Sequence, residues 1–154
     1  MNQYVKCFKP FSHNTYEVSN LTEYKTKTNG FKTSIKVFHV NICSIEKNLD
    51  ELLAFINTLN DSFDVIVLTE TFVIHDKDIF SIPNYDFYYN DSRINRNDGT
   101  VVLVKSDLEY NIKYCDIGPI KCIEVKLTLD QSNFFMQIYR NCILILIYKL
   151  CKCV

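Results

Sequence analysis

The spacing of apolar residues predicts a strand, a helix and a second strand in the first half of the chain. Residues 34–40 carry apolar side chains on both faces, which is typical of a strand that is mostly buried on both sides. From Ser44 the apolar residues recur at steps of three and four, which predicts an amphipathic helix of about fifteen residues with Ser44 as its N-cap. Residues 63–68 then read as a second buried strand, which runs into Glu70.

A strand, a helix and a strand in this order form a βαβ unit, and its crossover makes the two strands parallel. The first strand ends at Asn41, and the second leads into Glu70. Parallel strands finish at the same edge of a sheet. We therefore predict that Asn41 and Glu70 lie side by side at the carboxyl edge, where α/β sheets place their ligands.

Beyond residue 72 the helical spacing disappears, and the pattern predicts an antiparallel meander. The expected strands cover residues 85–89, 100–105, 110–114, 120–129 and 133–139. Residues 1–32 have no period and are predicted to be a poorly ordered leader, whereas residues 141–154 form a divergent apolar, Cys-rich tail. The sequence therefore predicts one domain over residues 33–140. Within the tail, residues 143–147 are a possible extra strand.

Composition and charge limit the kinds of function and location that are expected for the chain. The formal net charge of -1 gives no global basic field of the kind that marks many nucleic-acid-binding proteins. The seven cysteines lack zinc-finger spacing and no signal peptide is evident, so we expect free thiols and an intracellular protein, cytoplasmic or nuclear and not secreted. The longest apolar run, residues 142–148, is far shorter than the about 20 residues that span a bilayer, so no membrane partner is expected.

Five motifs occur in the order found in one enzyme superfamily. They are the strand end at Asn41, Glu70-Thr-Phe72, Ile82-Pro-Asn-Tyr85, the Asn97-Asp-Gly99 turn with its strand, and Gln137-Ile-Tyr-Arg140. Together they resemble the endonuclease/exonuclease/phosphatase superfamily, and most closely the apurinic-type endonuclease domains of non-LTR retrotransposons. The resemblance covers about residues 34–140. It departs from the family where Phe72 replaces a Trp, and after Arg140, where the family's Gly-Asp-Phe-Asn and Ser-Asp-His motifs are missing.

The resemblance implies an α/β (α+β) fold, namely an incomplete four-layer β-sandwich of the DNase I-like type with one βαβ unit followed by an antiparallel meander. It also implies a Mg²⁺-dependent DNA endonuclease, with catalytic roles for Asn41, Glu70 and Tyr139 and with Glu70 as the metal ligand. Because the family's second half is missing, we expect a fragment that is inactive by itself. The same absence predicts an uncovered sheet, poor solubility and self-association.

Each candidate also has a purely structural interpretation. A Glu that leaves a strand is often only solvated, an Asn in that place often forms a turn, and Tyr139 is one of ten tyrosines. His39 is expected to be a packed histidine with a satisfied ring. No role is assigned to His13, His75, Arg93, Arg96 or Lys105. Two other functions stay open: a non-catalytic fragment that binds nucleic acid or a protein, and a phosphoesterase of the same superfamily with another substrate.

Overall fold

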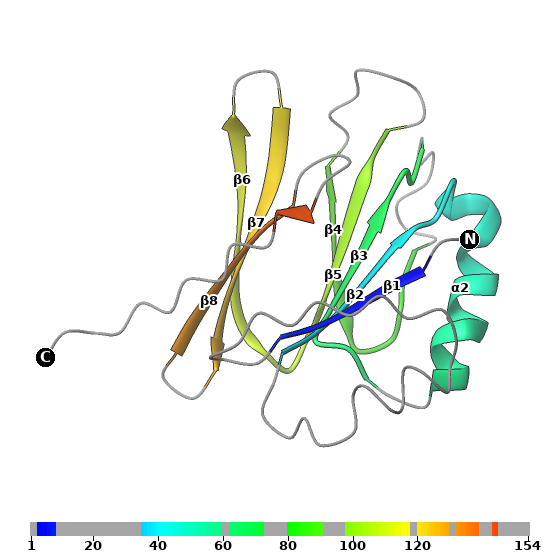
Figure 1. Cartoon of the computed structure of the whole chain (residues 1–154), viewed down its shortest axis with the longest axis horizontal. Helices are drawn as coiled ribbons and strands as arrows, with labels where there is room; N and C mark the ends of the chain where they lie inside the picture. The colour runs from blue at the N-terminus through cyan, green and yellow to red at the C-terminus, as the bar shows by residue number, and fades with distance from the viewer. Residues whose placement is uncertain are drawn as a thin grey trace, which may run out of the picture.

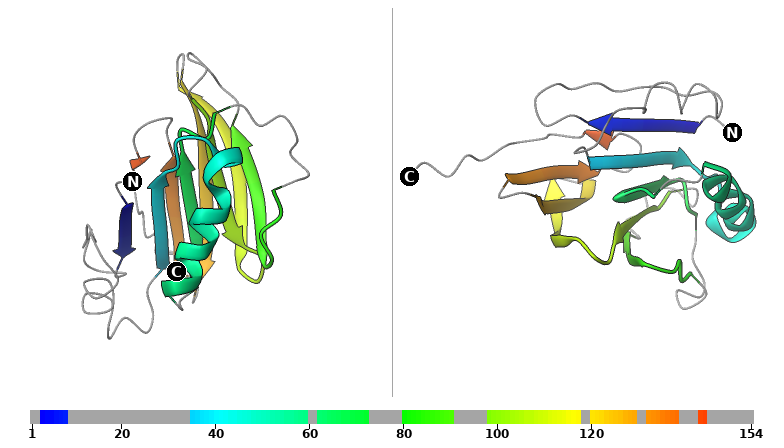
Figure 2. Two further views of the ribbon diagram at one scale, coloured as in Figure 1. Left: turned by 90° about the vertical axis from the view of Figure 1, so that its right-hand side faces the viewer. Right: turned by 90° about the horizontal axis from the view of Figure 1, so that it is seen from below.

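The described residues form two sheets and one helix. The computed structural model describes residues 3–8, 35–59, 62–72, 80–90, 98–117, 120–129, 132–138 and 143–144. Within them the architecture is mixed α/β with strands in the majority, which confirms the predicted class at this level (Figure 1). The helix lies on one side of the first sheet and the second sheet lies on the other side (Figures 1 and 2).

The first sheet has the strand order β1-β2-β3-β5-β4, and the second has the order β6-β7-β8-β9. In the first sheet the strands and the helix that packs on it are β1 (Gln3–Phe8), β2 (Ile35–Asn41), α2 (Ile45–Leu59), β3 (Val65–Thr69), β4 (Tyr85–Asn90) and β5 (Thr100–Lys105). The second sheet consists of β6 (Glu109–Ile117), β7 (Ile120–Leu129), β8 (Ser132–Ile138) and β9 (Ile143–Leu144).

The predicted βαβ unit is present. Strands β2 and β3 pair in parallel, with Val37 opposite Val65 at one end and Asn41 opposite Thr69 at the other. The carbonyl oxygen of Ser44 accepts the Asn48 N–H at 3.2 Å, which is the bond expected when Ser44 precedes the first helical residue. The predicted strand, helix and strand boundaries are therefore correct to within about two residues, the usual uncertainty at element ends.

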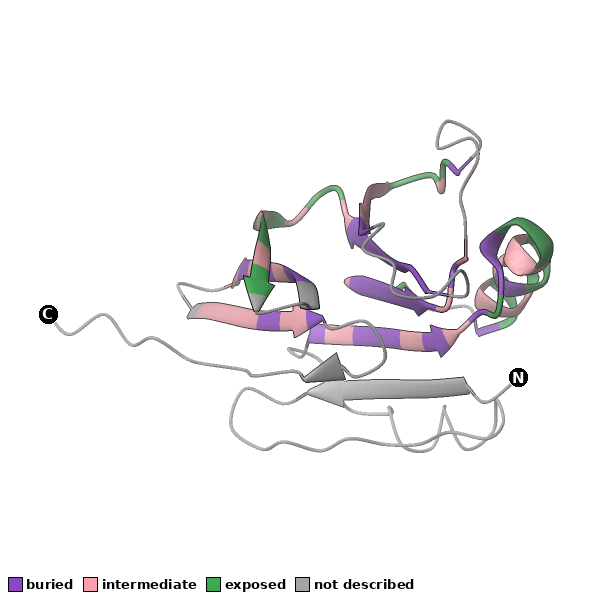
Figure 3. Cartoon of the chain, turned by 90° about the horizontal axis from the view of Figure 1, so that it is seen from above, coloured by how far each residue is buried: buried purple, intermediate pink, exposed green. Residues whose placement is uncertain are grey.

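Helix α2 buries its apolar stripe against the first sheet. Ile45, Leu52 and Leu59 are buried on the helix, and they join a core cluster with Phe38 and Leu68 of the sheet. The opposite side of the helix is exposed (Figure 3). This division follows from the sequence, because residues spaced three and four apart share one helical face. Within the described part of the chain, no helix combines the length and the apolar content that crossing a membrane requires.

The other face of the first sheet is covered by the second sheet. One core cluster joins the two, with Val37, Val67 and Val102 on the first sheet and Val125 and Met136 on the second; all but Met136, at 4%, are 0% exposed. The expectation that this face is left uncovered is therefore wrong for the central strands. Strands β6 to β8 supply the cover for these central strands.

The strands after residue 72 divide between the two sheets, which the predicted meander did not anticipate. Strand β5 inserts between β3 and β4 and is antiparallel to both, with Val65 opposite Val104 and Tyr85 opposite Lys105. Strands β6, β7, β8 and β9 form the antiparallel meander of the second sheet. The five expected strands all exist, but the first two extend the βαβ sheet.

Both ends of the chain contribute a strand. Residues 3–8, which lie in the predicted leader, form β1 and pair antiparallel with β2. Residues 143–144, which lie in the predicted tail, form β9 and pair antiparallel with β8, at the place where an extra strand was considered. The leader and tail are therefore not separate from the sheets at these positions.

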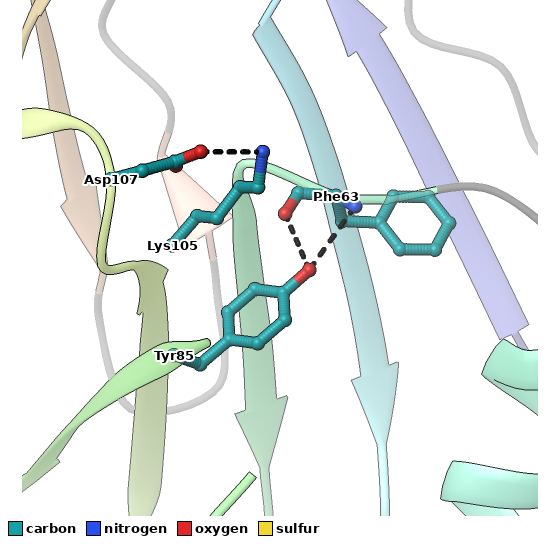
Figure 4. A network of polar contacts seen from close by, with 4 residues as sticks. All are labelled: Phe63, Tyr85, Lys105 and Asp107. Carbon is teal, nitrogen blue, oxygen red and sulfur yellow. Dashed lines mark hydrogen bonds and ion pairs between the residues drawn. The ribbon is translucent and has the colours of Figure 1, made fainter. Parts of the chain in front are cut away.

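A polar network joins β4 to the start of β3 (Figure 4). The Tyr85 hydroxyl donates to the carbonyl oxygen of Phe63 at 2.6 Å and accepts the Phe63 N–H at 3.2 Å. Burial raises the pKa of Tyr85, so its hydroxyl keeps its proton and remains a donor. Lys105 pairs with Asp107 at 3.0 Å beside this contact. The network lies at the end of the first sheet opposite to Asn41 and Glu70.

Replacing Tyr85 by phenylalanine is expected to lower the free energy of unfolding by about 1–3 kcal/mol, because both polar groups of the Phe63 backbone lose their hydroxyl partner. Urea unfolding followed by circular dichroism measures this loss. Tyr114→Phe is the matched control, because Tyr114 is 56% exposed and should change stability by less than about 0.5 kcal/mol. Equal effects of the two variants would contradict the structural role of the Tyr85 hydroxyl.

Candidate functional site

The candidate site is the carboxyl edge of the parallel strands β2 and β3. Asn41 is the last residue of β2, and its partner Thr69 is the last residue of β3, directly before Glu70. The predicted placement of Asn41 and Glu70 at one edge is therefore confirmed. Both side chains are half-buried, which leaves them accessible to a ligand.

A cysteine lies between the two predicted side chains. The Cys43 Sγ is 3.2 Å from the Asn41 Oδ1 and 3.6 Å from the Glu70 Oε2, so the thiol is within donor reach of both oxygens. The Cys43 N–H also donates to the Asn41 Oδ1 at 3.2 Å, in the manner of an Asx turn. The sequence pattern predicts no role for Cys43 at this edge. Its position two residues after Asn41 was the only available signal.

Electrostatics keep this thiol protonated. Partial removal from water, and then the neighbouring Glu70 carboxylate, raise the pKa of Cys43. At neutral pH the group is therefore a neutral donor toward the oxygens of Asn41 and Glu70. Of the described cysteine side chains, Cys43, Cys115 and Cys122 are free thiols, as expected for these three.

Backbone hydrogen bonds extend the pairing beyond the strands and hold the Glu70 segment in place. The N–H groups of Ile42, Ser44 and Ile45 donate to the carbonyl oxygens of Thr69, Glu70 and Thr71, at 3.0, 2.9 and 3.2 Å. The Asn48 side chain, in the first turn of α2, donates to the carbonyl oxygens of Ile42 at 2.7 Å and Cys43 at 3.2 Å. The start of the helix thus fixes both chain segments of the site.

Backbone strain is concentrated at this edge. Among the described residues, five non-glycine residues have positive φ, and four of them are here, namely Cys43 at 49°, Ser44 at 95°, Glu70 at 54° and Phe72 at 62°. Each such conformation costs on the order of 1–3 kcal/mol and persists only where the surroundings enforce it. Strained residues cluster at functional sites, which makes this edge a candidate site.

The β5 side of the site is closed by a tight contact with Gly99. The Thr71 N–H donates to the Gly99 carbonyl oxygen at 3.3 Å, and the Tyr89 hydroxyl donates to the Phe72 carbonyl oxygen at 3.3 Å. A Cβ atom on Gly99 would lie 2.4 Å from the Thr71 Oγ1, so only glycine fits there. The position of Glu70 is therefore set by α2 on one side and by β4 and β5 on the other.

Thr71 is fully buried, and its Oγ1 has no hydrogen-bond partner within the described part of the chain. Valine has the same shape without the hydroxyl, so Thr71→Val is expected to raise the free energy of unfolding by about 1 kcal/mol. Thr69→Val is the matched control, because the Thr69 Oγ1 is 3.2 Å from the His39 Nε2 and its removal should cost about 1 kcal/mol. Urea unfolding measures the free energy of unfolding of both variants. A loss of stability in both variants would contradict the unpaired state of Thr71.

The other predicted residues fall into two groups. His39 is half-buried and its Nε2 contacts the Thr69 hydroxyl, which agrees with the expected packed histidine. Lys105 lies beside Asp107 at the opposite end of the sheet and takes no part in the site. Outside the described residues are Tyr139, His13, His75, Arg93 and Arg96.

The donor set at the edge suits a hard cation. Glu70 provides a carboxylate and Asn41 an amide, and the half-exposed site leaves space for water, which matches the preference of Mg²⁺ for one or two carboxylates with water molecules. Among the described residues, no group of three or more His, Cys, Asp or Glu side chains is arranged to hold a metal ion. No protein-family model matches the sequence, and curated proteins give no significant match.

Proposed function

We propose that the chain is the N-terminal part of a Mg²⁺-dependent DNA endonuclease domain of the endonuclease/exonuclease/phosphatase superfamily, with a DNase I-like fold and an origin in a retrotransposon-like element. The observation that supports the proposal is the parallel pairing of β2 and β3, which brings Asn41 and Glu70 to one edge. The order of the sequence motifs and the strained backbone at this edge add support.

Each group at the edge has a chemical role in this proposal. Glu70 holds the cation, and the bound Mg²⁺ supplies positive charge that stabilises the negative charge developing on a phosphate. Asn41 orients the phosphate, because its Oδ1 is engaged by Cys43 and its NH₂ group is a donor suited to phosphate oxygens. The hydrogen bonds of Ser44 and Ile45 to the Glu70 segment hold the carboxylate in place before any ligand arrives.

The proposed activity of this chain by itself is binding without cleavage. In this proposal, hydrolysis of a phosphodiester requires a general base that takes the proton of the attacking water, in addition to the cation and the groups that position the phosphate. At the described edge, Glu70 is committed to the cation, Cys43 is protonated and the His39 ring contacts Thr69. None of these three groups is therefore available as the general base.

A second candidate function is a binding module without any metal dependence, acting on nucleic acid or on a protein. The observation that favours it is the thiol of Cys43, which contacts the oxygens of both Asn41 and Glu70. In this case the edge is a closed hydrogen-bonded cluster. The two candidate functions can be distinguished by whether binding depends on a metal ion.

Substitution of the carboxylate tests the proposed site. Glu70→Gln is expected to lower the affinity for Mn²⁺, a paramagnetic probe for Mg²⁺ sites, by at least tenfold, since even indirect partners of a metal ion contribute about 10–100-fold. Electron paramagnetic resonance of free Mn²⁺ measures binding, and competition with Mg²⁺ gives its affinity. The control is Glu51→Gln, which removes an exposed carboxylate from the middle of α2. Equal Mn²⁺ affinity of both variants would remove the metal site from the proposal.

A plasmid assay then tests the activity. With Mg²⁺ present, the chain is expected to retard supercoiled DNA in a gel without nicking it, and Glu70→Gln is expected to weaken the retardation. Nicking that disappears in Glu70→Ala would show an active enzyme and contradict binding without cleavage. Retardation that needs neither Mg²⁺ nor Glu70 would support the second candidate instead.

A further inference from the structure

Two cysteines face each other in the second sheet, outside the candidate site. Cys115 on β6 and Cys122 on β7 are direct partners in the antiparallel register, and both are free thiols. Facing residues of an antiparallel pair have Cα atoms about 4.5 or 5.5 Å apart, depending on the hydrogen-bonding pattern. Both values lie within the range of about 4.4–6.8 Å that a disulfide requires. The register therefore places the Cα atoms of the two cysteines within the range of a disulfide.

The two thiols differ in their accessibility. Cys122 is fully buried, whereas Cys115 is only half-buried. Burial, followed by the neighbouring Cys115, raises the pKa of the Cys122 thiol, and a hydrogen bond links the two side chains. A reagent in solution therefore meets Cys115 first, while Cys122 is protected and already in contact with it.

We propose that Cys115 and Cys122 form an oxidant-responsive dithiol, in which Cys115 reacts with a hydroperoxide and Cys122 converts the product into a disulfide across the β6–β7 pair. In the first step the Cys115 sulfur attacks one oxygen of hydrogen peroxide, an S–O bond forms, the O–O bond breaks and water leaves. Cys115 is then a sulfenic acid. In the second step the Cys122 sulfur attacks the Cys115 sulfur, the S–O bond breaks, and the hydroxyl group leaves as water with the Cys122 proton. Two thiols and one peroxide thus give one disulfide and two water molecules.

The resulting disulfide is readily reduced, because the paired strands hold the two Cβ atoms farther apart than a disulfide does. Facing Cβ atoms in an antiparallel pair are about 4.5–5.5 Å apart. A disulfide brings them to about 3.8 Å. Closing this difference distorts the edge strand β6, and strained disulfides are the ones that reductants open readily. The pair therefore acts as a redox switch of the second sheet and does not depend on the function proposed for the first sheet.

The test uses the full chain in its folded, reduced state with one equivalent of hydrogen peroxide. Remaining thiols are then blocked with N-ethylmaleimide and the peptides are mapped by mass spectrometry. The expected product is a Cys115–Cys122 cross-linked peptide that has lost two hydrogen atoms and is restored by dithiothreitol. The absence of this peptide from folded protein, or its formation only in urea, would overturn the proposal. This result decides the proposal even if a substituted chain fails to fold.

Two single substitutions test the order of the steps. Cys122→Ser should leave Cys115 as a sulfenic acid, which dimedone traps. Cys115→Ser should leave the buried Cys122 at least tenfold less reactive than Cys115 in the wild type, since accessibility and thiolate character control oxidation. Circular dichroism confirms that both variants are folded. The assignment of Cys115 as the reacting thiol would be overturned if Cys122 in the Cys115→Ser variant were oxidised as readily as Cys115 in the wild type.

Discussion

Replacing Gly99 by alanine is expected to lower the free energy of unfolding by about 2–4 kcal/mol and to weaken cation binding at the edge of the first sheet. Gly99 has φ of 123°, a conformation that alanine rarely adopts. Its added Cβ would lie 2.4 Å from the Thr71 Oγ1 and 3.0 Å from the Phe72 carbonyl oxygen. Because Thr71 directly follows Glu70, relief of these contacts moves the carboxylate.

The effect on the site distinguishes this variant from a general loss of stability. Urea unfolding gives the stability, and Mn²⁺ titration of the folded protein gives the affinity. Asn84→Ala is the matched control, because Asn84 also has positive φ, at 68°, but lies exposed in a turn before β4. It should lose about 1 kcal/mol or less and keep its Mn²⁺ affinity. A Gly99→Ala variant with unchanged Mn²⁺ affinity would show that the Glu70 segment is held by other contacts.

A double-mutant cycle with Thr71→Ala identifies the contact that causes the loss. Removing the Thr71 hydroxyl abolishes the 2.4 Å approach but leaves the backbone angle of Gly99 and the Phe72 carbonyl oxygen unchanged. Part of the cost of Gly99→Ala should therefore disappear in the double variant, with a coupling energy of about 0.5–3 kcal/mol. Additive effects would assign the whole cost to the backbone conformation of Gly99 and to the contact with the Phe72 carbonyl oxygen.

The βαβ unit could be predicted from the sequence because local periodicity and burial agree there. Leu52 and Leu59 of α2 share the helical face that packs on the sheet, and Val65 to Leu68 are buried on both faces of β3. A parallel crossover then requires the adjacency of Asn41 and Glu70, whatever the remaining strands do. This part of the site follows from the chain alone.

The rest of the site depends on contacts between distant segments. Nothing in the local pattern shows that Cys43 turns its thiol toward Asn41 and Glu70, because this follows from its positive φ in the folded turn. The role of Gly99 depends on β5 lying beside β3. The sequence pattern gives strands but not their partners, so it predicted β4 and β5 as members of a meander. Strand β1 was missed for a different reason, because residues 1–32 show no period from which a strand could be predicted.

Replacing Phe38 by alanine is expected to give the largest loss of stability, about 3–5 kcal/mol, out of a total that is typically about 5–15 kcal/mol. Phe38 is fully buried under α2, with its ring centroid 5.1 Å from that of Phe63 and 6.1 Å from that of Phe55. Alanine leaves a cavity between the helix and the first sheet, and close packing there prevents the neighbouring rings from filling it.

Urea unfolding followed by circular dichroism and calorimetry measures this loss. The control is Tyr114→Ala, which removes an aromatic ring of similar size that is 56% exposed, and it should cost about 0.5 kcal/mol or less. Phe38→Leu should fall between the two, because leucine refills most of the space. The protein that remains folded in the Phe38→Ala variant should keep its Mn²⁺ affinity, since the Glu70 segment is held by backbone bonds to Ser44 and Ile45. Loss of Mn²⁺ affinity in fully folded Phe38→Ala protein would mean that packing under α2, and not those bonds alone, positions the carboxylate.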